Sequence, residues 1–169
     1  HNVSIGNPYQ ALQNRVAYVP KDRDGEALMM GASIQNNFCL PSVETLKGRF
    51  GFLSPKKLYQ ASSKAREQFS VKSTGVDQLM RALSGGNKQK VNLGRWLIKD
   101  LDVLIVDCPT RGVDIGATEF IHRSILALRD QGKAVFLISS ELSEVKSLAD
   151  RIIVIHDGRI VGEFDAESV

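Results

Sequence analysis

The pattern of hydrophobic and polar positions changes at about residue 83. Beyond it, short apolar runs alternate with segments in which apolar residues recur at helical spacing. We expect strands at Val103–Val106, Ala134–Ile138 and Arg151–Ile155, the first two buried on both faces because their apolar runs are unbroken. Helices are expected from Ile115 to about Asp130 and from Glu141 to Leu148. Strands that alternate with helices predict an α/β fold with a parallel sheet.

The last of these strands leads into a tight turn. Asp157-Gly158 is a strong signal for a two-residue hairpin turn, because both residues tolerate the backbone that such turns require. We therefore expect Arg159–Phe164 to return as the second strand of a C-terminal hairpin.

The residues before position 83 contain little strand pattern. Residues 1–15 are polar and turn-rich, Val16–Val19 is a short β-prone run, and the charged loop Lys21–Gly25 follows. From there to residue 83 the chain is expected to be mainly helical. The domain prediction is a core formed by 1–24 and 84–169, with a helical subdomain at 25–83.

Two helices are expected within that subdomain. Ser33 can cap a short helix that ends at Phe38. A longer helix should run from Lys56 to about Phe69, because Ser54 suits the N-cap and Pro55 suits the first helical position.

The segment Leu83–Lys90 contains a third helix start. Ser84 is a good N-cap, and the two glycines after it leave no Cβ to block an approaching ligand. A capped helix N-terminus directs N–H groups and a partial positive charge outward, which suits a phosphate. The alternative is an ordinary helix start in which the glycines serve the preceding turn.

Asp107 is the strongest metal-ligand candidate, because it ends the strand Val103–Val106. Acidic residues at the carboxyl end of a parallel strand point into the crevice where α/β folds bind ligands. A carboxylate there can hold Mg²⁺, mostly through water. The alternative is an aspartate that caps a turn.

Composition narrows the protein classes but names no function. With 169 residues and 43% hydrophobic residues the chain can bury a core, and a formal charge of +3 is too small to indicate nucleic acid. Cys39 and Cys108 are the only cysteines and neither belongs to a paired motif, which favours a reducing compartment. No apolar run approaches the roughly 20 residues that span a bilayer, so membrane association is expected through a partner.

Several motifs in order resemble ATP-binding-cassette (ABC) ATPases. The stretch Leu83-Ser84-Gly85-Gly86-Asn87-Lys88-Gln89-Lys90 resembles their signature motif, Leu104-Ile105-Val106-Asp107 their magnesium-binding strand, and Arg111-Gly112-Val113-Asp114 the loop that crosses between two cassettes. The resemblance implies a P-loop NTPase-like fold. The phosphate loop Gly-x-x-x-x-Gly-Lys-Ser/Thr is missing, so we expect an N-terminally truncated cassette that neither hydrolyses ATP by itself nor binds it tightly.

A narrower resemblance is to the second cassette of ribose, xylose and galactose importers. Four stretches carry it: Ala17-Tyr18-Val19-Pro20-Lys21-Asp22-Arg23, Pro109-Thr110-Arg111-Gly112-Val113-Asp114-Ile115-Gly116-Ala117, Ile138-Ser139-Ser140-Glu141-Leu142 and Asp150-Arg151-Ile152-Ile153-Val154. In that family two cassettes hold ATP between them at the cytoplasmic face of the membrane and drive a permease. We expect residues 22–37 to contact the permease, or else to be solvated surface.

The resemblance also implies roles for individual residues. The signature motif would contact ATP held mainly by a second cassette, Lys21 would stand at the glutamine of the lid loop, Asp107 would bind Mg²⁺, and Asp114 would act from the crossing loop. The nucleotide-binding residues expected in the signature motif are Ser84, Gly85, Gly86 and Gln89.

Three departures from the family pattern predict that this cassette's own site is slow. Cys108 stands where the family has the glutamate that activates water, and a neutral thiol is a poor hydrogen-bond acceptor. Ser140 stands at the switch histidine and Lys21 at the lid glutamine. The alternatives are a small buried residue for Cys108 and a helix cap for Ser140.

Two functions follow. The first is part of the ATPase subunit that energises monosaccharide import, and the second is a catalytically degenerate cassette that regulates or supports another cassette. The equivalent subunit of a nucleoside importer is a further alternative within the family.

Overall fold

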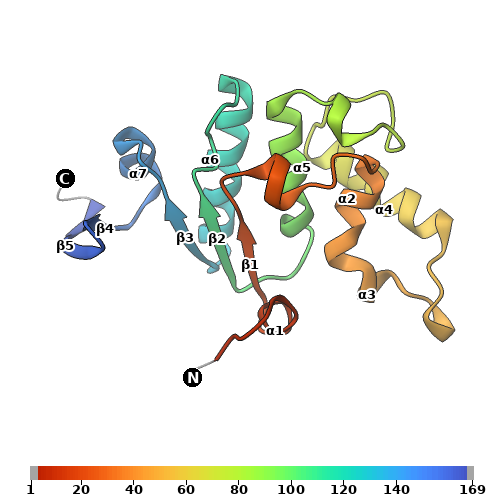
Figure 1. Cartoon of the computed structure of the whole chain (residues 1–169), viewed down its shortest axis with the longest axis horizontal. Helices are drawn as coiled ribbons and strands as arrows, with labels where there is room; N and C mark the ends of the chain where they lie inside the picture. Colours follow the sequence, from red (N-terminus) through yellow and green to blue (C-terminus); the bar gives the residue numbers. More distant parts are fainter. Residues whose placement is uncertain (1–3, 167–169) are drawn as a thin grey trace.

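A three-stranded parallel sheet forms the centre of the molecule (Figure 1). The computed structural model describes residues 4–166. Strands β1 (Val16–Val19), β2 (Val103–Asp107) and β3 (Ala134–Ile138) lie side by side in that order. Val19 is level with Val106, and Asp107 is level with Ile138, so the three strands end at the same edge. The expected α/β fold with a parallel sheet is confirmed.

One face of this sheet is packed against helices α5 (Gly85–Leu97) and α6 (Ile115–Asp130), and α6 has the expected bounds. Apolar side chains recur along α6 at helical spacing and meet the inward-facing residues of β1 and β2. The buried cluster contains Ala17, Val19, Leu93, Leu101, Leu104, Val106, Ile121, Ile125, Leu128 and Leu148.

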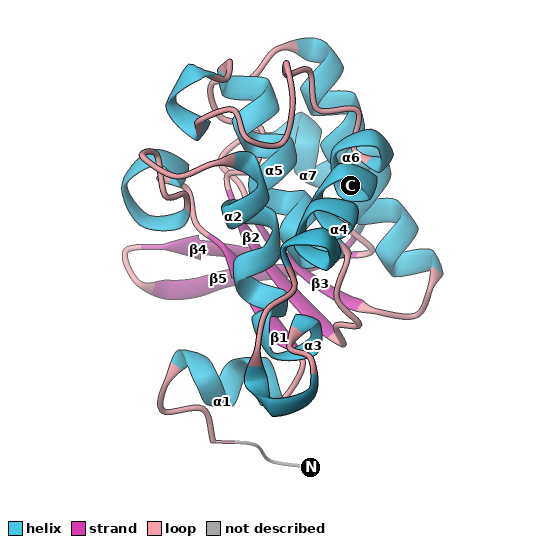
Figure 2. Cartoon of the chain, turned by 90° about the vertical axis from the view of Figure 1, so that its right-hand side faces the viewer, coloured by secondary structure: helices cyan, strands magenta, loops and turns pink. Residues whose placement is uncertain are grey.

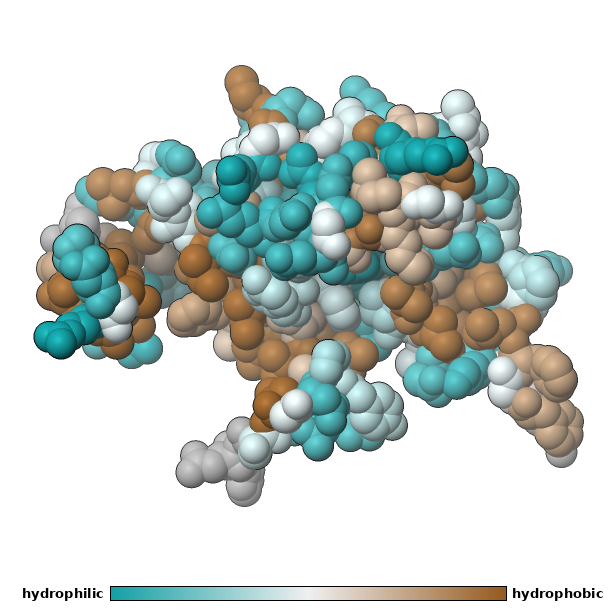
Figure 3. All heavy atoms as spheres, viewed as in Figure 1, coloured by the Kyte–Doolittle hydropathy of each residue, from teal (hydrophilic) through white to brown (hydrophobic). Residues whose placement is uncertain are grey.

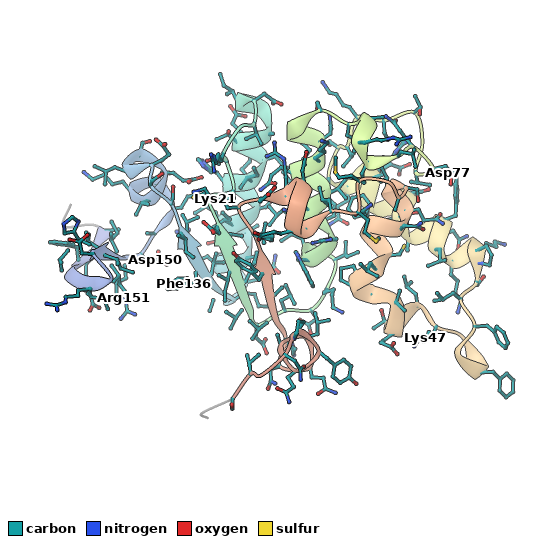
Figure 4. The ribbon with its side chains drawn as sticks, in the orientation of Figure 1. Lys21, Lys47, Asp77, Phe136, Asp150 and Arg151 are labelled. Carbon is teal, nitrogen blue, oxygen red and sulfur yellow. The ribbon has the colours of Figure 1, made fainter. Side chains whose placement is uncertain are left out.

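The other face of the sheet is not covered by the described residues. Side chains alternate between the faces of a strand, so Phe136 (53% exposed) and Ile138 (43% exposed) point away from α6. Apolar surface is visible on this side of the molecule in Figure 3, and Figure 4 shows Phe136 at the edge formed by β3. The expectation that β2 and β3 are buried on both faces is therefore wrong for the part of the chain that is described.

The C-terminal strands form a separate hairpin. β4 (Arg151–His156) pairs antiparallel with β5 (Arg159–Asp165), after helix α7 (Leu142–Leu148). Asp157 and Gly158 both have positive φ, as the two-residue turn requires. The hairpin is confirmed, but β4 does not extend the parallel sheet, because its pairing with described residues is to β5 alone.

The helical part of the chain lies on the other side of α5 and in front of the strands in Figure 2. Its two main helices are α2 (Ile34–Cys39), capped by Ser33 as expected, and α4 (Pro55–Gln68). Ser54 has the N-cap position of α4, but its side chain makes no capping hydrogen bond. The short elements are η2 (Leu40–Ser42), α3 (Val43–Leu46), η3 (Arg49–Gly51) and η4 (Met80–Ala82).

Two further elements were not expected. Helix α1 (Pro8–Gln13) begins after Asn7, whose side chain accepts a hydrogen bond from Gln10 N. The charged segment after β1 is not an open loop, because it forms one π-helical turn, η1 (Arg23–Ala27).

A second apolar cluster joins these helices to α5, and it contains Leu28, Ile34, Phe38, Ala65, Phe69, Val71, Met80, Leu83 and Val91. Since α5 contributes Leu93 to the first cluster and Val91 to the second, one helix holds both parts together. The domain bounds 25–83 stay a prediction. No described helix is long and apolar enough to cross a membrane.

The contact between α5 and Phe69, the residue that follows α4, gives a stability prediction. A Cβ at Gly94 would lie 2.5–3.0 Å from the Phe69 ring, which is itself buried. Gly94→Val should lower the free energy of unfolding by about 2 kcal/mol, because a crowded core side chain cannot move freely. Urea denaturation measures this, with Gly31→Val as control, since a Cβ at Gly31 has nothing within 4 Å. Equal effects of the two substitutions would contradict the packing.

Candidate functional site

The carboxyl edge of the sheet brings together four residues predicted from the sequence: Lys21, Asp107, Cys108 and Ser140. Asp107 is the last residue of β2, while Lys21 and Ser140 each follow their own strand by two residues. Figure 4 shows Lys21 at this edge. Because parallel strands end together here, residues far apart in the chain become neighbours.

Cys108 lies in the middle of this group. Its backbone amide donates to Ile138 O at 2.8 Å, and its φ of 45° turns the chain sharply away from the sheet. Burial raises the pKa of the thiol, and a hydrogen bond to Asp107 and that carboxylate's charge raise it further. Lys21 and the backbone amide of Ser140 act in the opposite direction. The thiol is therefore protonated at neutral pH and has no base function there.

Tyr18 is a neighbour of Asp107 that sequence reasoning missed. Burial and the Asp107 carboxylate raise the pKa of its phenol, with smaller contributions from Glu26 and Cys108. The signal was available, since Tyr18 lies on the same face of its strand as Val16 and interrupts an otherwise apolar run.

Asp107 fits a magnesium ion as a single carboxylate ligand. Among residues 4–166 no group of three or more His, Cys, Asp or Glu side chains could hold a metal by itself. Mg²⁺ does not require one, because it commonly takes one or two carboxylates and completes its shell with water and phosphate oxygens. The donor set is thus compatible with a metal that arrives with a nucleotide.

A buried polar network holds the loop that carries Ser140. Glu144 on α7 is buried, accepts a hydrogen bond from Ser139 Oγ at 2.6 Å, and lies 3.2 Å from His122 Nε2 on α6. Ser139 Oγ also accepts from Glu141 N at 3.1 Å. The N-cap of α7 is Glu141 and no side chain caps this helix, so the alternative role of Ser140 as a helix cap is wrong. Ser140 itself is exposed.

The signature segment forms a second group at the start of α5. Ser84 is exposed and caps the helix, accepting from Asn87 N at 3.4 Å and from Asn87 Nδ2 at 2.8 Å. The first-turn amides of Gly85 and Gly86 have no acceptor within the helix. A helix end of this kind can donate to an anion, and its contact with phosphate stays a prediction.

The two glycines serve a different purpose from the one expected. A side chain at Gly86 would collide with the Asp114 carboxylate and with Ala117 Cβ, and one at Gly85 would lie 2.9 Å from Arg23 Nη2 and 3.1 Å from Gly112 O. The missing Cβ atoms thus face the protein's own loop and not an open approach for a ligand. The glycines allow α5 to touch the segment between β2 and α6.

Gln89 and Asp114 also have partners inside the chain. Gln89 is 3% exposed and donates from Nε2 to Pro109 O at 2.8 Å. Asp114 caps α6 by accepting from Ala117 N at 2.9 Å. The geometry makes Gln89 a residue that holds the 109–114 segment in place, and its contact with nucleotide stays a prediction.

The ABC transporter family model matches residues 2–111, which is more than half of the chain. The chain belongs to this family. The matched range includes the signature segment, Lys21, Asp107 and Cys108, while Asp114 and Ser140 lie beyond it.

Curated relatives are sugar-import proteins by name. A putative ribose/galactose/methyl galactoside import ATP-binding protein of Burkholderia lata is 39% identical over 164 residues, 97% of this chain and 32% of the relative. The L-arabinose transport ATP-binding protein AraG of Geobacillus stearothermophilus is 39% identical over 98% of this chain and 32% of its own length. The chain thus spans about a third of the length of these ABC relatives.

Solved ABC cassettes share the fold. The dimeric post-hydrolysis structure of the cassette MJ0796 bound to ADP and Pi superposes with a TM-score of 0.76, covering 91% of this chain and 64% of that one. A second dimeric structure of the same cassette has a TM-score of 0.75. At 20% identity this similarity establishes the arrangement of the sheet and helices and nothing finer.

The environment of Cys108 gives a pH prediction. Because burial and Asp107 disfavour the thiolate, alkylation of Cys108 by iodoacetamide should rise with pH at a midpoint above that of free cysteine. Peptide mass spectrometry separates it from Cys39. Asp107→Asn should lower the midpoint and Lys21→Met should raise it, since these residues act in opposite directions. A midpoint below that of free cysteine would contradict this environment.

Proposed function

We propose that this chain is part of the ATP-binding subunit that energises monosaccharide import through a membrane permease. The observation that carries the proposal is the intact start of α5, where exposed Ser84 and two glycine amides form an anion-binding helix end. The names of the sugar-import relatives supply the substrate class.

The same helix end is built to act on a second cassette. Asp114 and the amides of Gly85 and Gly86 lie together, because α5 and the 109–114 segment are in contact through Gly86. In phosphoryl transfer, positioning and electrostatics supply most of the catalysis. A helix N-terminus that approaches the γ-phosphate from across an interface provides both, and bound ATP with Mg²⁺ would supply the reacting phosphate and its counterion.

The carboxyl edge of the sheet would bind this cassette's own nucleotide, but its residues are poorly suited to hydrolysing it. Asp107 would hold Mg²⁺ and Lys21 would contribute positive charge. Cys108 in its protonated form offers neither a base nor a strong acceptor for the attacking water. General acid–base help is worth roughly 10²–10⁴ in rate, so we propose that hydrolysis at this edge is slow.

The residues Lys21, Cys108 and Ser140 at the carboxyl edge of the sheet favour a second candidate function. In it, this cassette supports or regulates a partner cassette and does not hydrolyse ATP itself. The two functions are compatible in one transporter, because one site of a cassette pair can hydrolyse while the other binds. We place the assembly at the cytoplasmic face of the membrane, with residues 22–37 at the permease.

The helix-end proposal is tested by Ser84→Arg in the full-length protein. The larger cation would remove the cap and occupy the space where the γ-phosphate should lie, so transport-coupled ATPase turnover should fall at least about a hundredfold. Ser143→Arg, at an exposed position of α7, is the matched control and should leave turnover unchanged. Turnover intact in Ser84→Arg would refute a role for this helix end.

The proposed deficiency at Cys108 is tested by Cys108→Glu. A carboxylate at this position restores an acceptor for the attacking water, so turnover of the full-length protein should rise roughly tenfold or more. Cys108→Gln is the control, because it matches the size without providing a base. A loss of turnover in Cys108→Glu, with MgATP binding retained, would show that the thiol is not the limiting feature.

A further inference from the structure

The loop after β1 is attached to the crossing loop, residues 111–114, by one side chain. Arg23 donates from Nη1 to Arg111 O at 3.0 Å and from Nη2 to Gly112 O at 3.3 Å. Both acceptors are backbone carbonyls of an otherwise exposed segment. Gly112 has a positive φ, a backbone conformation that glycine adopts without strain.

The same guanidinium group also touches the signature helix. Because Gly85 has no side chain, Arg23 Nη2 lies only 2.9 Å from where a Cβ would be, and Gly112 O lies 3.1 Å from the same point. The Arg23 side chain is only 19% exposed. Three segments that are distant in sequence thus meet around one planar cation.

Neighbouring residues hold the backbone of Arg23 in place, and one of them, Asp24, also lies 3.7 Å from Arg23 Nε. Asp24 forms an ion pair with Lys88 on α5 at 2.7 Å, and Arg95, also on α5, donates to Ala27 O at 2.7 Å. Asp22 Oδ1 accepts from Gly25 N at 3.0 Å. The η1 turn is therefore fixed to α5 at both ends, and Arg23 projects from this fixed turn.

We propose that Arg23 is the positioning residue that holds the crossing loop against the signature turn, so that Ser84 and Asp114 present one rigid surface to the partner cassette. This inference rests on the proposed function. Lysine could not replace it, because a single ammonium cannot direct two donors in a plane to adjacent carbonyls.

Hydrogen exchange of the full-length protein tests the structural part. In Arg23→Ala and in Arg23→Lys, the amides of residues 111–118 should exchange at least about tenfold faster, while those of β2 and the buried part of α6 stay unchanged. Arg123→Ala is the control, because this arginine pairs with Glu119 on the exposed side of α6. Exchange unchanged at 111–118 in both variants, or raised equally throughout the chain in both, would overturn the proposal.

ATPase kinetics test the functional part. Because Arg23 reaches the nucleotide only through the loop it holds, Arg23→Ala should lower kcat at least about fivefold with the KM for ATP changed less than about twofold. Arg23→Lys should recover only part of the rate, and full recovery would overturn the need for a planar donor pair. Intact turnover in Ser84→Arg would instead refute the proposed function and leave the exchange result standing.

Discussion

The close contact between α5 and the segment that follows β2 is the constraint on which the rest of the structure depends. It is possible only because Gly86 has no side chain where the Asp114 carboxylate and Ala117 lie. Gln89 fixes the same segment one turn further along, through Pro109 O. Since α5 also contributes to both apolar clusters, this contact places the helical part of the chain, the signature turn and the sheet edge relative to one another.

The molecule presents two chemically different edges. At the start of α5, the cap and the first-turn amides have the chemistry of a helix end that can donate to an anion. At the end of β2, a thiol whose pKa is raised by burial lies beside the Asp107 carboxylate. The two edges therefore differ in the chemistry that their side chains offer, an exposed cap with first-turn amides at one and a thiol beside a carboxylate at the other.

Sequence patterns predicted the helices and strands better than they predicted the burial and the long-range contacts of those elements. The bounds of α6 and the hairpin turn followed from apolar spacing and from Asp157-Gly158, which are local signals. The burial of β2 and β3 did not follow, because an unbroken apolar run does not say which elements cover each face. The sequence also contained no sign that Gly86 and Gln89 contact the 109–114 segment, because their partners Asp114 and Pro109 lie 20 residues or more away.

What the sequence by itself determined was the order of strands and helices after residue 83 and the family motifs. These depend on residue identity and short-range spacing, which are legible along the chain. Only the tertiary structure decided that Arg23 bridges two loops and that Ser139, Glu144 and His122 hold a third. Such contacts are set by how helices pack across the sheet, and no local pattern encodes the meeting of residues about 90 positions apart.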